Sequence, residues 1–144
     1  MTTETWDPSA WENALIEDMR AHGGRPSQGP LAGDPLLLLY TTGARTGEPR
    51  RSLLTYSRDG DAYVVAGTAS GAPVDPKWVG NIEKTPTVEL EVANETFQAT
   101  GEVLRGGPER DRLWDQHVAA LPRFAEYPAQ VGARIIPVVR LRRA

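Results

Sequence analysis

The order of short strand-like runs and turn signals constrains the fold of this 144-residue chain more than any other feature. Runs with apolar or alternating patterns predict six strands, and most of these runs are joined by turns rather than by helices. This order differs from the regular strand–helix alternation of a doubly wound parallel sheet. It favours a small, mainly β barrel of mostly antiparallel strands, which we predict at residues 36–42, 50–58, 62–68, 87–92, 96–104 and 134–141.

Three segments have helical patterns and are expected at the periphery of the barrel: residues 8–21, 76–83 and 108–120. In the first of them an apolar stripe recurs at helical spacing, and we expect it to pack on the core: Trp11, Leu15, Ile16 and Met19. Residues 23–35 are too rich in Gly and Pro for regular structure. The length predicts a single domain over residues 1–144.

Charge and composition exclude several classes of function. A net charge of −3 and a pI near 5.4 argue against a nucleic-acid-binding surface. The absence of cysteine excludes disulfides, thiolate metal sites and a cysteine nucleophile. His22 and His117 lie far apart in the sequence, so we interpret them as surface or packing residues, and we expect no metal site. No run approaches the ~20 apolar residues of a membrane span, which predicts a cytoplasmic protein without stable membrane insertion.

The turn after the first predicted strand departs from this acidic balance. Residues 41–51 carry Arg45, Arg50 and Arg51 together with two glycines, a proline and several free backbone N–H groups. Guanidinium groups and neighbouring amide donors are the components of a site for phosphate or carboxylate. From these residues alone, an ordinary solvated turn remains the alternative.

The chain lacks a catalytic motif of its own. It has neither of the glycine patterns of Rossmann and P-loop proteins, and no Gly-x-Ser-x-Gly. An anion site without a catalytic set is typical of a protein that hosts an organic cofactor. Residues 66–71 have only small or hydroxyl side chains, which would let a flat ring approach the backbone. The helix that follows Pro76 presents free N–H groups that favour an anion.

Taken in order, these segments resemble the deazaflavin-dependent nitroreductase family over about residues 10–142. The resemblance is carried by Leu36–Arg50, Asp59–Asp61, Val64–Ala66, Gly71–Ala72, Pro76–Trp78, Asn81 and Ile136–Val139. It implies a split β-barrel that binds coenzyme F-420 (8-hydroxy-5-deazaflavin). It also implies an oxidoreductase that transfers hydride from the reduced coenzyme to a quinone, a nitroaromatic or an activated alkene.

The resemblance further implies roles for individual residues. The cofactor's phosphate and tail would be held by Arg45, Thr46 and Arg50. Its ring would be lined by Ser52, Leu53, Leu54 and Thr55, by the backbone of Ala66, Gly67, Thr68 and Ala69, and at the helix start by Lys77, Trp78 and Asn81. The substrate pocket would include Phe124 and Tyr127. The candidate proton donors are Tyr127, Thr55 and Thr68, with solvent as the alternative source.

Three positions depart from the family's usual residues. Ala44 and Ala69 stand where basic residues are common, and Leu53 stands at a frequent proline position. The two missing cations weaken the grip on an acidic oligoglutamate tail, and Arg25 is a candidate to compensate. FMN or FAD therefore stays open as the cofactor, and a non-catalytic deazaflavin or flavin carrier stays open as the function. The expected partner is a small-molecule electron acceptor, and a homodimer is left open.

Overall fold

The computed structural model describes residues 8–144, and a seven-stranded sheet dominates that part of the chain. All neighbouring strands are antiparallel, in the order β2-β1-β5-β6-β7-β4-β3. The strands are β1 (Leu36–Thr42), β2 (Pro49–Thr55), β3 (Ser57–Asp59), β4 (Ala62–Ala66), β5 (Thr87–Val92), β6 (Glu95–Leu104) and β7 (Val138–Arg143). The predicted antiparallel fold class is confirmed, with one strand more than expected. Residues 1–7 of the predicted domain lie outside the described residues.

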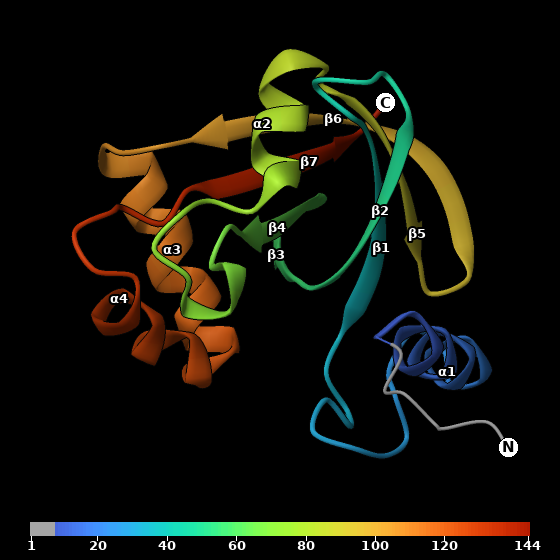
Figure 1. Cartoon of the computed structure of the whole chain (residues 1–144). Coiled ribbons are helices and arrows are strands. Elements are labelled where there is room, and N and C mark those ends of the chain that lie inside the picture. Colours follow the sequence, from blue (N-terminus) through green and yellow to red (C-terminus); the bar gives the residue numbers. More distant parts are fainter. Residues whose placement is uncertain (1–7) are drawn as a thin grey trace, which may run out of the picture.

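The two edge strands of the sheet are consecutive in the chain. Only Tyr56 separates β2 from β3, and its N–H donates to the carbonyl oxygen of Pro35 at 3.1 Å instead of to a strand partner. The chain changes partner at this point, because β2 pairs with β1 whereas β3 pairs with β4. The sheet consequently curls into a half barrel (Figure 1). The single strand predicted over 50–58 is corrected to two strands that meet at Tyr56.

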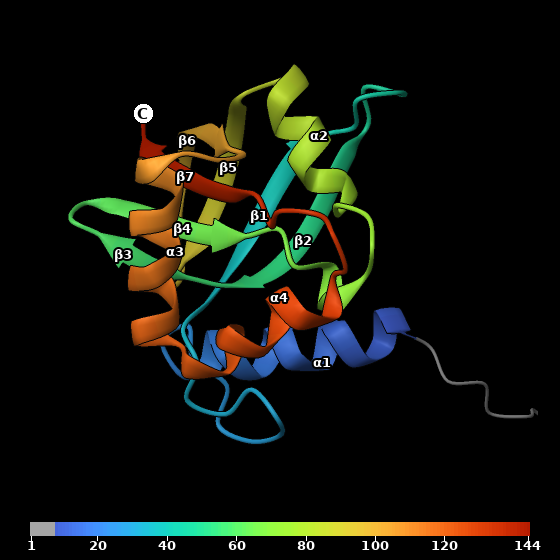
Figure 2. The same ribbon diagram turned by 90° about the vertical axis from the view of Figure 1, so that its left-hand side faces the viewer.

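The helices cover the outside and one end of this half barrel. They are α1 (Pro8–Ala21), α2 (Lys77–Lys84), α3 (Pro108–Ala120) and α4 (Tyr127–Gln130), with short 3-10 turns η1 (Ala69–Gly71) and η2 (Pro122–Glu126). α3 packs on β3, β4 and β7, whereas α2 packs on β1 and β6 (Figures 1 and 2). Two predicted helices have the expected bounds, and the third is shifted by one residue.

The continuous apolar run of β1 is explained by burial on both of its faces. Leu37 and Leu39 point into the half barrel, where α2 contributes to the same core. Leu36 and Leu38 face the opposite way and pack with Ile16 and Met19 of α1. The predicted stripe of α1 is wrong at Trp11, which is 52% exposed and contributes little to this contact.

β4 and β7 are shorter than predicted at the ends that approach each other. β4 stops at Ala66, because the N–H of Gly67 donates to the carbonyl of Pro137 at 2.8 Å, outside the ladder. β7 starts at Val138 rather than at Arg134, because Pro137 has no N–H to donate and the carbonyl of Ile136 accepts hydrogen bonds from Arg110.

None of the helices described between residues 8 and 144 combines the length and the apolar character that a membrane crossing requires.

Candidate functional site

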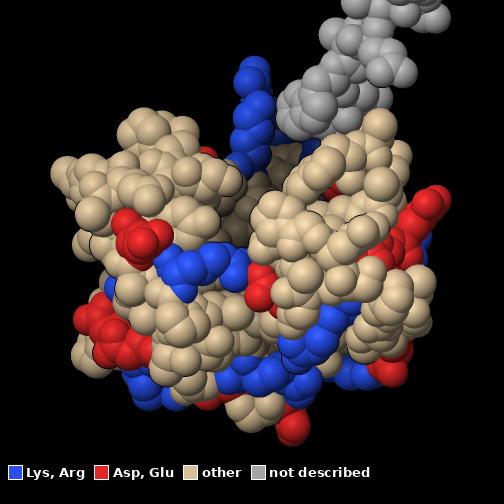
Figure 3. Space-filling view, turned by 90° about the horizontal axis from the view of Figure 1, so that it is seen from below, with Lys and Arg blue, Asp and Glu red and all other residues tan. Residues whose placement is uncertain are grey.

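A cleft of about 660 Å³ lies between the β1–β2 turn and the first turns of α2. It is lined by Gly43, Ala44, Arg45, Thr46, Arg50, Arg51, Ser52, Lys77, Trp78, Gly80 and Asn81. Four of these residues are cationic and none is acidic, although the chain as a whole carries a net charge of −3. Seen from below, the molecule is hollowed between two lobes, and Lys or Arg atoms project beside the hollow (Figure 3). The four cations without an acidic neighbour in the lining make the cleft beside α2 a local site of positive potential.

The β1–β2 turn is closed by its own backbone. The N–H of Gly43 donates to the carbonyl of Glu48 at 2.7 Å, and the N–H of Gly47 donates to the carbonyl of Gly43 at 2.9 Å. Gly47 has a φ of 73°, which glycine adopts without steric cost. A side chain at position 43 would lie 3.0 Å from the hydroxyl oxygen of Thr46. The turn therefore favours glycine at position 47 for its backbone angle, and a side chain at position 43 would require its neighbours to shift.

Helix α2 fixes the turn from the other side of the cleft. Asn81 is buried, and its side-chain oxygen accepts a hydrogen bond from the N–H of Ala44 at 2.9 Å. Its side-chain nitrogen donates to the hydroxyl of Thr41 at 3.1 Å. Lys84 donates to the carbonyl of Ala44 at 2.6 Å. The backbone N–H and the backbone carbonyl of Ala44 are consequently both held by side chains of α2.

The cationic residues of the cleft differ in how far their charges are already paired. Arg51 contacts α1, at 3.4 Å from a carboxylate oxygen of Glu12. Arg50 makes an exposed ion pair with Glu48 at 3.3 Å. Arg45 has no carboxylate partner among residues 8–144. Arg45 and Arg50 are therefore the guanidinium groups most available to a bound anion.

The structure brings half of the predicted cofactor residues into this cleft. Those that line it are Arg45, Thr46, Arg50, Ser52, Lys77, Trp78 and Asn81. Those that lie beyond its lining are Leu53, Leu54 and Thr55, farther along β2, and Ala66, Gly67, Thr68 and Ala69, at the end of β4 and the start of η1. Arg25 also lies outside the lining and donates to the carbonyl of Gly33.

Four lining residues were not among the predicted site residues: Gly43, Ala44, Arg51 and Gly80. Arg51 was recognised as part of the basic turn but was not assigned to the site, although its neighbour Arg50 was. Gly80 lies one turn into α2, and a side chain there would meet no atom within 4 Å. No signal in the sequence distinguished Gly80 from any other helical glycine.

The two aromatic residues assigned to the substrate pocket lie in different environments. The rings of Phe124 and Tyr127 are 5.3 Å apart and meet edge to face. Phe124 is buried and packs against the His117 ring at 4.5 Å, so most of its surface belongs to the core. Tyr127 is half-buried and retains surface that a ligand could contact.

His117 is a buried packing residue of this second cluster. Its Nδ1 lies 2.6 Å from the hydroxyl of Ser57, whereas its Nε2 is buried without a hydrogen-bond partner. Burial, with a smaller contribution from the nearby Arg123 guanidinium, lowers the pKa of His117 to about 4. The ring is therefore neutral at physiological pH. In residues 8–144 no group of three or more His, Asp or Glu side chains could hold a metal ion.

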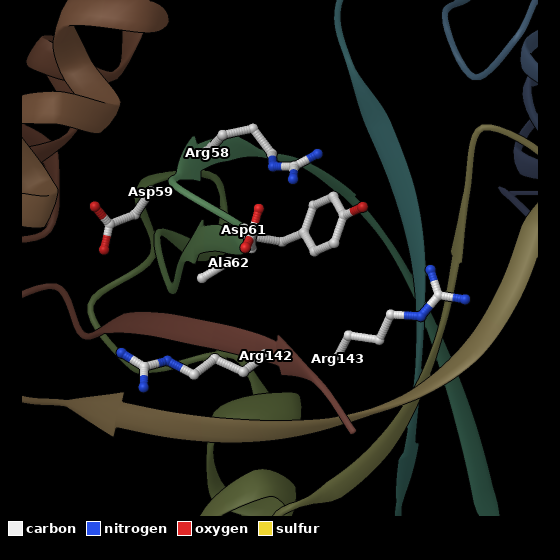
Figure 4. Close-up of a pocket in the computed structure, with 7 residues that line it drawn as sticks. Arg58, Asp59, Asp61, Ala62, Arg142 and Arg143 are labelled. Atoms are coloured by element: carbon white, nitrogen blue, oxygen red, sulfur yellow. The ribbon is translucent and has the colours of Figure 1, made fainter.

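A second hollow, of about 640 Å³, lies beside β3, β4 and the end of β7. Its lining mixes both charges: Arg58, Asp59, Asp61, Ala62, Tyr63, Arg142 and Arg143. The guanidinium groups of Arg142 and Arg143 point in opposite directions, as neighbouring residues on a strand do (Figure 4). This hollow therefore lacks the convergent cations of the cleft beside α2.

A curled antiparallel sheet of this kind is the architecture of a split-barrel protein, and its cationic cleft lies at one end of β1 and β2. The family model for F420H(2)-dependent quinone reductase matches residues 13–142. The F420H(2)-dependent quinone reductase Rv1261c of Mycobacterium tuberculosis is 37% identical over 126 residues, which cover 86% of this chain and 84% of that protein. The chain belongs to the F420H(2)-dependent quinone reductase family.

Solved structures agree with this assignment. An F420-H2 dependent reductase (FDR-A) has 31% sequence identity and a TM-score of 0.66, covering 74% of this chain and 93% of that one. A domain-swapped dimer has 28% identity and a TM-score of 0.68, covering 94% of this chain and 99% of that one. The predicted split barrel, the predicted enzyme class and F-420 as the cofactor are confirmed. Family membership also favours the enzyme over the non-catalytic carrier.

Proposed function

We propose that the cleft between the β1–β2 turn and α2 holds the phosphate and acidic tail of F-420, and that the adjoining face of β2 holds its ring. The observation that supports this placement is the convergence of Arg45, Arg50, Arg51 and Lys77 on a cleft without a carboxylate. Such a donor set suits a phosphodiester and carboxylates, because guanidinium groups bind both through charge-assisted hydrogen bonds. The side chains that line the cleft are therefore suited to an anionic ligand.

When bound, the reduced cofactor supplies a hydride, which together with one proton converts a quinone to its hydroquinone and leaves the cofactor oxidised. The residues of the chain bind and orient the two reactants and exclude water between them. Ser52 lines the cleft, and Leu54 lies on the same face of β2 and packs on the core of the half barrel, so this face of the strand extends from the cleft as a surface for a flat ring. The loop that follows β4, residues 67–76, leads to the opposite wall, because it runs directly into α2.

The proton can be supplied by a hydroxyl group beside the acceptor. The hydroxyl oxygen of Thr55 accepts a hydrogen bond from Arg123 at 3.1 Å, which leaves its own hydrogen free to be donated. Arg123 is itself held by Asp34 at 2.7 Å. Among the three candidate donors, Thr55 is the one with a cation at hydrogen-bond distance, which stabilises the oxygen as its proton leaves.

The acceptor is a quinone that lies against Tyr127. The Tyr127 ring is half-buried and is braced edge-on by Phe124, so it offers a rigid aromatic surface for a flat apolar molecule. This assignment gives the two aromatic residues separate tasks: Tyr127 contacts the acceptor and Phe124 supports Tyr127.

Titrations of the purified protein with F-420, FMN and FAD test the cofactor site, with turnover of a quinone measured on the same sample. We expect F-420 to bind more tightly than either flavin and to support turnover. The matched variant is Arg45→Ala, and its control is Arg142→Ala, which removes an exposed arginine outside the cleft. A loss of F-420 affinity in both variants, or in neither, would contradict the placement.

A homodimer is the assembly that we propose for the chain in solution. The relative at 28% identity forms a domain-swapped dimer. Here the connection between α1 and β1, residues 22–35, is long enough for α1 to pack on a second copy while β1 stays in place. Light scattering coupled to size exclusion gives the mass directly, and a monomer at every concentration would exclude the dimer.

A further inference from the structure

One arginine from outside the cleft holds the loop between β4 and α2. Arg134 belongs to the segment that connects α4 to β7. Its guanidinium donates to four acceptors of the loop: the carbonyl oxygens of Gly67 (2.9 Å), Thr68 (2.8 Å) and Ala72 (3.0 Å) and the carboxylate of Asp75 (2.9 Å). The contacts reach both ends of the loop, so this one side chain ties the two ends together.

The same loop has a backbone conformation that requires outside support. Ala69 and Ser70 have φ angles of 48° and 55°, and Gly71 follows with 86°. Two successive non-glycine residues in the left-handed region are energetically disfavoured and persist only where the surrounding structure fixes them. The contacts of Arg134 on either side of these residues provide that constraint.

The segment that carries Arg134 also packs directly against the loop. A side chain at Gly67 would lie 2.8 Å from the Pro137 ring, and one at Gly71 would overlap Gln130. The N–H of Gly67 donates to the carbonyl of Pro137. The loop and the α4–β7 segment therefore form one closely packed unit.

This unit positions two parts of the proposed site. The end of the loop continues into α2, where Lys77 and Trp78 line the cleft. At its start, the carbonyl of Thr68 is turned toward Arg134. Because a trans peptide unit is planar, the N–H of Ala69 then points to the opposite side, away from Arg134. Arg134 thus determines the direction in which the loop presents its amide.

We infer that Arg134 is a positioning residue for F-420, which acts through the loop at residues 67–76. The inference rests on the proposed function, which places this loop beside the ring. The required feature is the planar fork of the guanidinium, because it serves four acceptors at once. A lysine would keep the charge, but its three donors lie on a single nitrogen and cannot reach acceptors spread along the loop in this way.

The chain offers a matched control for Arg134. Arg110 is buried to a similar degree, with 11% of its side chain exposed against 13% for Arg134. It also bonds the α4–β7 segment, donating twice to the carbonyl of Ile136, but it comes from α3 and makes no hydrogen bond to the loop. A loss of general stability should therefore appear in both variants, whereas a loss of loop order should appear only at Arg134.

The experiment compares the wild type with Arg134→Met, Arg134→Lys and Arg110→Met. For each, F-420 affinity is titrated, amide hydrogen exchange of residues 67–76 is measured without cofactor, and the melting temperature is recorded. We expect both Arg134 variants to weaken F-420 binding at least tenfold and to accelerate exchange in the loop at least tenfold. Arg110→Met should change either quantity less than twofold, even where its melting temperature falls equally.

Several results would overturn the inference. Wild-type affinity in Arg134→Lys would show that the charge suffices, and equal losses in Arg110→Met would show a general destabilisation. Unchanged exchange in the loop would show that Arg134 does not order it. If Arg134→Met does not fold, the milder Arg134→Lys carries the same comparison. A wild type that fails to bind F-420 would contradict the proposed function, whereas the exchange measurement tests the ordering of the loop separately.

Discussion

The side chain of Asn81 accepts the backbone N–H of Ala44 at 2.9 Å, so a buried residue of α2 holds the middle of the turn that carries Arg45. The same amide donates to Thr41, so both polar atoms of this buried side chain are engaged in holding the turn. Its contribution to the cofactor site is consequently the shape of the turn.

Replacing Asn81 by Ala should therefore loosen the turn. The change leaves the N–H of Ala44 and the hydroxyl of Thr41 without partners, which costs about 1–3 kcal/mol of folding free energy. We expect F-420 affinity to fall as well. Titration measures this affinity, and chemical denaturation of the same variant measures the folding free energy. Asn81→Asp is the informative companion, because its carboxylate can accept from both groups but adds a negative charge. It should keep most of the stability and still bind F-420 weakly.

Arg50→Ala should weaken F-420 binding by about 1.5–3 kcal/mol, roughly ten- to a hundredfold. The guanidinium is half-exposed and its present partner, Glu48, is an exposed carboxylate that a phosphate can replace. Binding of the wild type should also weaken as salt is raised, because exposed charges are screened. A dissociation constant independent of salt would argue against phosphate recognition at this turn. Folding stability should barely change in the variant.

The stability of the protein should fall in mild acid because of His117. Burial keeps its pKa at about 4 in the folded state, against 6.5 for an ordinary histidine. Between these values the unfolded chain binds more protons, so the free energy of unfolding increases with pH. The contribution of about 3 kcal/mol is complete above pH 6.5 and is lost as the pH falls toward 4.

Urea denaturation of the wild type and of His117→Leu between pH 4 and pH 7 measures this contribution. The variant should show a much flatter dependence over that range. His22→Leu serves as the control, since His22 is an exposed residue directly after α1 and lies outside the core. An identical pH profile in the wild type and His117→Leu would contradict the assignment.

Kinetic and stability measurements should distinguish the roles of the two aromatic residues that follow α3. Tyr127→Ala is expected to raise the KM for a quinone several-fold while F-420 affinity stays unchanged, because of the two reactants only the acceptor is placed against this ring. Phe124→Ala should instead lower stability by about 3–5 kcal/mol, since it empties a buried aromatic position. Tyr127→Phe keeps the ring and removes the hydroxyl. An unchanged kcat in that variant would leave Thr55 as the stronger candidate for the proton donor.

Features that depend on local sequence were predictable. The helix at 108–120 and the strand at 36–42 have their predicted bounds, because periodicity and breakers within each segment determine them. The glycines and arginines of the β1–β2 turn indicated the anion site for the same reason, since they are neighbours in the sequence.

Features that depend on distant partners were not predictable. The break at Tyr56 is caused by a hydrogen bond to Pro35, and the late start of β7 follows from contacts with Arg110. The four contacts of Arg134 join residues about 60 positions apart. Likewise, Phe124 is buried in a cluster that includes Val64 and Val138, which no spacing within its own segment could show.

The strand order has a consequence for how the protein is made. β7 lies between β6 and β4 in the sheet, yet it follows all the other strands in the chain. Until residues 138–143 leave the ribosome, the β3–β4 hairpin has no strand that joins it to the rest of the sheet. The nascent chain therefore exposes the unpaired edges of β6 and β4 during synthesis, when such edges invite aggregation. We expect the ability to bind cofactor to arise only after translation of β7, in a single late step.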